Sequence, residues 1–165
     1  MLFRSLVWDQ ALVNLVPDEL QDQLGIAIAK RCYRAYRRSL GSSDWKVLEA
    51  AGARPQRLLF ASTGTKSKRR PDTYYVEALA APDTINTMPQ PTLDALIDHG
   101  HVGELLSADA VDADQMVAQF ESRGIDVQGL AARLQTEGAK AFVDSWEDLM
   151  QKLAGKATKV SAGVT

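Results

Sequence analysis

The sequence predicts an α/β fold in which short buried strands alternate with helices. The segment Arg57–Thr63 is a short apolar run between Pro55 and Gly64, which is typical of a buried strand. Ahead of it, over residues 17–40, apolar residues recur at helical spacing. Buried strands between helices favour a parallel sheet with helices on its faces.

Two helices are expected before this strand. Pro17 suits the first turn of a helix over residues 17–40, and Gly41 suits its end. A shorter helix follows, capped by Ser43 or Asp44. Its inward-facing residues are expected to be Trp45, Val47 and Leu48.

After the strand, residues 64–72 form a polar loop and Thr73–Leu79 one or two helical turns. A second strand is predicted over residues 84–88, and Pro91 opens another helix. The inner side of that helix is expected to hold Leu93, Leu96 and Ile97.

The rest of the chain is predicted to be helical. Its three helices are expected over residues 109–123, 127–137 and 139–154. The apolar stripe of the last helix comprises Phe142, Val143, Trp146, Leu149, Met150 and Leu153, and Trp45 and Trp146 are expected to anchor the core.

This order of elements is typical of a β/α barrel, but the strands are too few to close one. A (β/α)8 barrel needs eight strands and roughly 250 residues. We therefore expect one partial domain: an incomplete (β/α)8 TIM barrel, followed by a helical tail, with the other strands either missing or supplied by another chain. The expected segments are an uncertain start at 1–12, barrel strands with their helices at 13–100, C-terminal helices at 101–155 and a flexible tail at 156–165.

Composition indicates an ordinary soluble protein, with 45% hydrophobic and 24% charged residues. Cys32 is the only cysteine, so no internal disulfide is possible, and a lone cysteine fits a reducing compartment. No signal peptide and no apolar stretch of ~18 residues is recognisable. The expected location is the cytoplasm, with no membrane partner.

Charge is distributed unevenly along the chain. Residues 1–70 contain 13 Lys/Arg and 6 Asp/Glu, whereas residues 71–165 contain 6 and 15. A basic half favours an anionic partner, either small phosphates or nucleic acid, and the alternative is two solvated faces of opposite sign. Nucleic acid is disfavoured because no aromatic residues interleave the basic loop 66–70.

Three segments resemble transaldolase, of the long-form subfamily found alone or fused to phosphoglucose isomerase, and the resemblance implies that the chain is the C-terminal part of its (β/α)8 TIM barrel. Residues 52–66, GARPQRLLFASTGTK, resemble its seventh strand, with Phe60 where Trp is usual. Residues 72–77, DTYYVE, with 82–89, PDTINTMP, and the helix after them resemble the eighth-strand region. Residues 123–126, RGID, with 137–139, EGA, resemble the closing helices.

The resemblance implies an enzyme of the pentose phosphate pathway that uses a Schiff base. A lysine would attack the ketone of fructose 6-phosphate or sedoheptulose 7-phosphate and pass a dihydroxyacetone unit to glyceraldehyde 3-phosphate or erythrose 4-phosphate. It implies neither a metal nor an organic cofactor. The family's acid/base aspartate, glutamate and lysine belong to strands that precede this segment. No lysine here stands in the family's Ile/Val-Lys-Ile/Val-Pro setting, so the chain alone is predicted to be inactive.

What the resemblance leaves to this chain is phosphate binding. Ser62 matches the family's phosphate-site serine, and Lys66 is the candidate cation. The amides of Thr63 and Gly64 are further candidate donors. The alternative for these residues is an ordinary strand end followed by a solvated loop. The family's sixth strand carries a phosphate-binding arginine, where this chain has Leu6; either Arg4 substitutes for it, or the start is unrelated.

The remaining candidates are interpreted as structural. Cys32 is expected to be an ordinary helix residue. His99 and His101 flank Gly100, but no Cys or carboxylate stands around them at a familiar metal-ligand spacing, so no metal site is predicted. Asn86 and Met88 follow the second strand, where packing or a polar network is favoured over a site contact.

Overall fold

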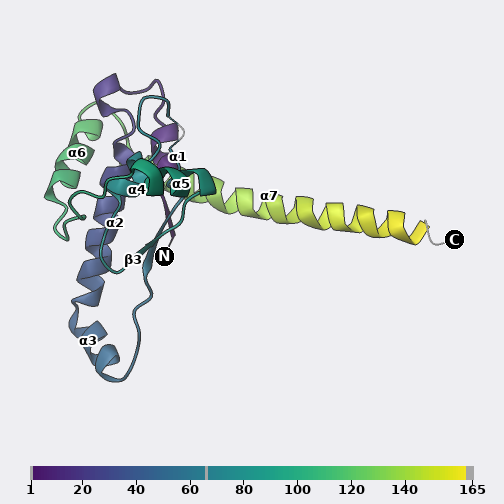
Figure 1. Ribbon diagram of the computed structural model, residues 1–165, viewed down its shortest axis with the longest axis horizontal. Helices are drawn as coiled ribbons and strands as arrows, with labels where there is room; N and C mark the ends of the chain where they lie inside the picture. The colour runs from purple at the N-terminus through teal and green to yellow at the C-terminus, as the bar shows by residue number, and fades with distance from the viewer. Residues whose placement is uncertain (1, 66, 163–165) are drawn as a thin grey trace. The chain divides into compact units, whose positions relative to one another are not determined.

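The computed structural model describes residues 2–65 and 67–162 of the chain. The chain divides into two compact units, Met1–Ile125 and Asp126–Thr165. The elements of the first unit, in order, are β1 (Leu2–Arg4), α1 (Ser5–Gln10), the 3-10 turn η1 (Asp18–Leu20), α2 (Leu24–Leu40), α3 (Ser43–Ala50), β2 (Leu58–Ala61), α4 (Tyr74–Ala78), β3 (Thr84–Asn86), α5 (Gln90–His99) and α6 (Val111–Glu121) (Figure 1).

The sheet has three parallel strands in the order β1-β2-β3 among the residues described. Its register pairs Phe3 with Phe60, and Phe60 with Asn86. Each crossover contains helical structure, as parallel strands require. The α/β class and the parallel sheet predicted from the sequence are therefore observed. The short strand β1 lies in the segment whose assignment the sequence left open.

The core of the first unit forms where α2 meets β2. Apolar side chains from the two elements, with residues from the segments around them, are buried together: Ala29, Tyr33, Leu58, Phe60, Leu79 and Leu106. Helix α2 also packs on α1 and α6. Cys32 is a partly buried side chain against this core, and burial raises the pKa of its thiol. That environment fits its interpretation as a structural residue.

Two predicted helix details in the first unit are wrong. The predicted helix 17–40 is a 3-10 turn and then α2, because Asp22 adopts a left-handed backbone at φ 63° and separates them. Helix α3 is capped by Ser42, whose hydroxyl oxygen accepts from the Trp45 amide, and not by Ser43 or Asp44.

The expected inner faces of α3 and α5 are also corrected. Val47 and Leu48 are exposed, and Trp45 is half-buried, so α3 buries no residue fully. On α5, Leu93 and Ile97 are exposed and only Leu96 is half-buried. Apolar spacing predicts which residues share a face, but burial requires a neighbour that covers this face.

The second unit is a single helix, α7 (Val127–Ala162). Two helices were expected, with Gly138 between them and a flexible tail after Gly155. A lone glycine costs only about 1 kcal/mol in a helix interior, and the flanking residues are good helix formers. Helix α7 therefore runs through both glycines. Trp146, expected to anchor the core, is 63% exposed.

Candidate functional site

The candidate site lies at the carboxyl ends of β2 and β3. Because the two strands are parallel, these ends meet at one edge of the sheet. In α/β folds this edge is where ligands bind. Strand β2 ends at Ala61 and is followed by Ser62, and β3 ends at Asn86. The sequence-predicted Ser62 and the neighbouring amides therefore stand beside Asn86.

Ser62 turns the chain out of β2. Its backbone adopts φ 59°, the left-handed region that non-glycine residues rarely occupy, and its side chain is half-buried. Backbone strain of this kind is concentrated at functional sites. The turn brings Thr63 back toward β3.

Thr63 connects the two strand ends. Its side chain is fully buried, and its hydroxyl lies 2.7 Å from the Asn86 Oδ1 atom and 3.1 Å from the Thr87 carbonyl oxygen. This link fixes the backbone immediately after Ser62. For Asn86, a polar network is observed, as the sequence favoured. The role of the Thr63 hydroxyl was not predicted, because strand pairing, not local sequence, brings it to Asn86.

Gly64 closely approaches the start of α5. A Cβ atom on Gly64 would lie 3.0 Å from the Pro89 ring and 3.2 Å from the Thr92 hydroxyl. The loop after β2 is thus pressed against the segment after β3. A side chain at residue 64 would therefore require the Pro89 ring or the loop to shift slightly.

Unpaired polar atoms are concentrated beside this site. Among the described residues, the buried side-chain atoms without a hydrogen-bond partner are Thr65 Oγ1, Asn86 Nδ2 and Arg70 Nε. Such atoms are uncommon in folded proteins and point to a missing partner or to local strain. Thr65 and Asn86 belong to the two strand-end segments themselves. Lys66, the predicted phosphate-binding cation, lies outside the described residues.

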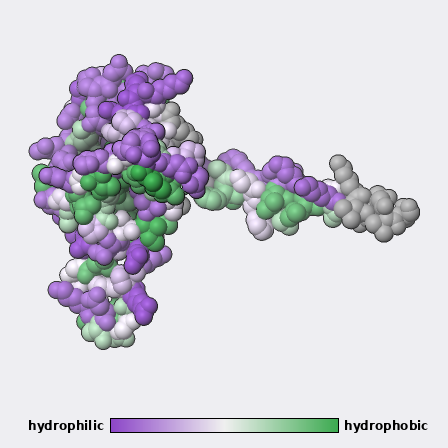
Figure 2. Space-filling model, in the orientation of Figure 1, coloured by the Kyte–Doolittle hydropathy of each residue, from purple (hydrophilic) through white to green (hydrophobic). Residues whose placement is uncertain are grey.

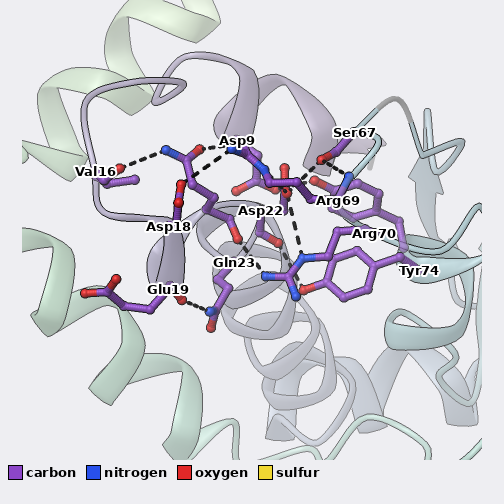
Figure 3. A network of polar contacts seen from close by, with 12 residues as sticks. Asp9, Val16, Asp18, Glu19, Asp22, Gln23, Ser67, Arg69, Arg70 and Tyr74 are labelled. Carbon is purple, nitrogen blue, oxygen red and sulfur yellow. Dashed lines mark hydrogen bonds and ion pairs between the residues drawn. The ribbon is translucent and has the colours of Figure 1, made fainter.

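Beyond Lys66, the loop enters a polar network around Asp22 (Figure 3). The Ser67 hydroxyl donates to Asp22 Oδ2 at 3.0 Å, and the guanidinium groups of Arg69 and Arg70 lie within 4 Å of the same oxygen. Sequence analysis missed this network. The available signal was the basic run 68–70 together with the acidic residues of 18–22.

Asp9 is a buried carboxyl group in the same group of polar residues as Asp22 (Figure 3). It accepts from the Gly25 amide at 2.9 Å and from the Tyr75 hydroxyl at 2.8 Å. Desolvation by burial raises the pKa of Asp9 to about 6, although these hydrogen bonds oppose the shift. Burial, together with the adjacent Asp9, raises the pKa of Tyr75 as well. Asp9 therefore fixes the first turn of α2 through the Gly25 amide, although burial disfavours the charged form of its carboxyl group.

The two histidines do not form a metal centre in the part of the chain that the structure describes. No group of three or more His, Cys, Asp or Glu side chains is placed there to hold a metal ion. His99 instead lies between two carboxylates, 2.9 Å from Asp72 and 3.1 Å from Asp98. The hydrogen bond to Asp72 raises the pKa of His99 most, and the hydrogen bond to Asp98 raises it further.

Several cations of the basic half of the chain are paired with acidic side chains. On α2, Arg34 forms a bidentate pair with Asp114 at 2.5 and 2.8 Å, and Arg37 lies 2.6 Å from Asp83. Lys30 is paired with Asp112. The charge asymmetry along the sequence is therefore partly neutralised by contacts between the basic and acidic halves.

The arrangement defines a class of protein: an α/β protein whose small polar side chains gather where parallel strands end. Hydroxyl and amide groups at such an edge are suited to a small polar or anionic ligand. Within the described residues no helix is both long and apolar enough to cross a membrane.

Comparison with known proteins identifies the family. The model of the transaldolase/fructose-6-phosphate aldolase family matches residues 4–153. The chain therefore belongs to this family, as the resemblance of its strand segments predicted.

The relatives it resembles are transaldolases. That of Neisseria meningitidis serogroup C, strain FAM18, is 42% identical over 145 residues, which is 88% of this chain and 41% of the relative. That of Frankia alni is 43% identical over 136 residues, 82% of this chain and 37% of the relative. That of Thermobifida fusca is 41% identical over 150 residues, which is 88% of this chain and 41% of the relative. The chain thus spans about two-fifths of the length of the curated relatives it matches.

Proposed function

We propose that this chain is the C-terminal part of a transaldolase of the long-form subfamily. In this proposal β1, β2 and β3 are the sixth, seventh and eighth strands of a (β/α)8 barrel. The observation that carries it is the family match over residues 4–153, in a chain that spans 41% of its relative. The three-stranded parallel sheet supports it, because β1 and β3 each have an unpaired edge in the described sheet where further strands can add.

The site contributed by this part binds the phosphate of the sugar substrate. Ser62 donates its hydroxyl, the amides of Thr63 and Gly64 stand beside it, and Lys66 supplies a positive charge. Support comes from the position of Ser62 at the carboxyl end of β2 and from its left-handed backbone. The substrates proposed for the whole enzyme are those that the family resemblance implies, among them fructose 6-phosphate and erythrose 4-phosphate.

The chemical step belongs to residues outside this chain. A lysine amine adds to the substrate ketone and water leaves, which gives an iminium. Cleavage of the neighbouring C–C bond releases one aldose phosphate and leaves the dihydroxyacetone unit on the lysine as an enamine. The enamine carbon then adds to the aldehyde of the acceptor aldose phosphate, and water hydrolyses the resulting iminium to release the product and the lysine. The lysines of this chain do not match the family's setting, and the described ones among them lie on helices or in the loop after β2. We therefore propose that the isolated chain does not catalyse the transfer.

Complementation tests this proposal. The part of the Neisseria meningitidis transaldolase that this chain does not match is expressed with it, and transfer from fructose 6-phosphate to erythrose 4-phosphate is measured. Activity is expected only when both parts are present, and a Ser62→Ala chain is expected to raise the KM for fructose 6-phosphate about tenfold, the loss of one hydrogen bond to a charged group. Activity of this chain by itself, or an unchanged KM with Ser62→Ala, would contradict the proposal.

The alternative is a non-catalytic module that binds phosphate or nucleic acid. Arg34 and Arg37 are already paired with aspartates, so they are less able to neutralise phosphates and to release counterions from a nucleic acid. This pairing disfavours nucleic-acid binding. Retention on a heparin column at physiological salt, lost as the salt is raised, would instead favour it.

A further inference from the structure

The apolar stripe of helix α7 is exposed. Its large side chains recur at spacings of three and four residues along 142–153, so they share one face of the helix. Each of them is between 47% and 69% exposed, and Figure 2 shows hydrophobic surface of this kind along α7. An exposed apolar patch is typical of a surface that binds another protein segment. The members of the stripe are Phe142, Val143, Trp146, Leu149, Met150 and Leu153.

The opposite face of α7 is occupied by charges that pair within the helix. Lys140 lies 2.7 Å from Asp144, and Lys152 lies 2.6 Å from Asp148. Asp144 and Asp148 each stand two residues from Trp146, which is roughly 200° around a helix of 3.6 residues per turn. The stripe has no such partner within its own unit, because α7 is the one element that the described residues of that unit form.

The stripe belongs to the segment that the family shares. The family model matches residues 4–153, so the match includes every residue of the stripe and ends at Leu153. The exposed residues that follow, 154–158, contain no large apolar side chain. The apolar face is therefore a feature of the family domain and not of the tail after it.

Most of each relative lies outside the match. The chain spans 41% of the Neisseria meningitidis transaldolase and 37% of that of Frankia alni, and we call the remainder the unmatched part. In the first unit, β1 and β3 each have an unpaired edge in the described sheet. Both units thus present surfaces without a neighbour, and the unmatched part can supply a neighbour to each.

We propose that the α7 stripe docks on an apolar surface of the unmatched part of a transaldolase. The stripe would then be covered in the complete domain, since most of the stability of an amphipathic helix comes from packing of its apolar face. This inference rests on the proposed function, and it adds α7 to the sheet edges as a surface that joins the two parts. A lipid surface suits the stripe less well, because Asp144, Glu147 and Asp148 offset the lysines of α7.

Three alanine variants of α7 separate the stripe from the rest of the helix. Trp146→Ala and Leu149→Ala remove stripe side chains. Gln151→Ala is the matched control, because Gln151 is exposed and stands two residues from Leu149, on the opposite face. Alanine has the highest helix propensity, so each variant is expected to keep the helix, and circular dichroism checks this.

The test measures association with the unmatched part. Each variant of the chain is co-expressed with the unmatched part of the Neisseria meningitidis transaldolase, and the Kd is measured by sedimentation velocity over a dilution series. Trp146→Ala is expected to raise the Kd about thirtyfold and Leu149→Ala about tenfold, as for side chains at the centre of an interface. Gln151→Ala is expected to leave the Kd within about twofold. Amide exchange of residues 142–153 is expected to be slower in the complex than in the chain alone.

The outcomes separate the docking from the function on which it rests. Association that depends on Trp146, without transfer of the dihydroxyacetone unit, would support the docking and contradict the proposed catalysis. Association and transfer with an unchanged Kd in Trp146→Ala would overturn the docking and leave the proposed function standing. No association of the wild-type chain, including aggregation of the unmatched part beside a soluble chain, would overturn both.

Two further results would identify a different occupant of the stripe. If the chain alone sediments as a dimer and Trp146→Ala makes it a monomer, a second copy covers the stripe and the docking proposal is wrong. Slow exchange of residues 142–153 in the monomeric chain, made fast by Trp146→Ala, would mean that the first unit of the same chain covers the stripe, which also overturns the proposal.

Discussion

Helices α2 and α7 share an amphipathic pattern but differ in what covers their apolar faces. In the first unit, α2 buries Leu24, Ala29 and Tyr33 against its neighbours. In the second unit, α7 leaves six large apolar side chains exposed: Phe142, Val143, Trp146, Leu149, Met150 and Leu153. Figure 2 shows the corresponding hydrophobic surface along α7. The spacing of apolar residues along a helix therefore specifies which residues form one face, whereas burial of that face requires a neighbouring element that covers it.

A matched pair of phenylalanine substitutions tests this difference most strongly. Phe120 on α6 is fully buried, and Phe142 on α7 is 69% exposed. Phe120→Ala is expected to lower the free energy of unfolding by about 3–5 kcal/mol, because it leaves a cavity. Phe142→Ala is expected to change it by no more than about 0.5 kcal/mol. Urea unfolding of both variants measures this. Equal losses would mean that the α7 face is packed in the isolated chain.

The next largest expected effect is the dependence of stability on pH that the buried Asp9 carboxyl group causes. Its pKa in the folded chain is about 6, above the ordinary value of 3.8, so the folded state binds the proton more tightly than the unfolded state. Stability is therefore expected to fall as pH rises from about 4 to about 6, by about 3 kcal/mol in total.

Asp9→Asn is the variant that isolates this effect, because an amide keeps an acceptor for the Gly25 amide but does not titrate. The stability of Asp9→Asn relative to the wild type should therefore rise by about 3 kcal/mol between pH 4 and pH 7. The measurement is chemical denaturation across this range, with Asp94→Asn on the exposed side of α5 as the control. A constant difference between Asp9→Asn and the wild type at all pH values would contradict the assignment.

The smallest effect concerns the continuity of α7. A Cβ atom on Gly138 would meet nothing within 4 Å. Gly138→Ala is expected to stabilise the helix by about 0.5–1 kcal/mol, seen as slower amide exchange around residue 138. Gly129 is the control in the same helix, because a Cβ there would clash with Oδ2 of Asp126, the residue whose Oδ1 accepts from the Gly129 amide at the start of the helix. If both substitutions have the same effect, α7 does not begin and continue as described.

Local features of the fold could be predicted from the sequence, and contacts between distant segments could not. The strand at Leu58–Ala61 was recognisable as an apolar run bounded by Pro55 and Gly64. The break at Asp22 was not, because an aspartate in a left-handed turn has the same local pattern as one in the first turn of a helix.

Within the candidate site, the position of Ser62 at a strand end could be predicted from the apolar run before it. Its phosphate-binding role comes from the family resemblance and stays a prediction. The Thr63–Asn86 link and the Asp22–Ser67 contact join segments 23 and 45 residues apart. No local pattern marks such contacts, since they form only when parallel strands bring the segments together.

Trapping of the Schiff base tests the central claim most directly. The complemented pair of chains is incubated with fructose 6-phosphate and sodium borohydride, which reduces an iminium to a stable amine, and each chain is then weighed by mass spectrometry. The account predicts added mass on the complementing transaldolase part and none on this chain. Added mass on a lysine of this chain, whether complemented or alone, would contradict the claim that its nucleophile lies elsewhere.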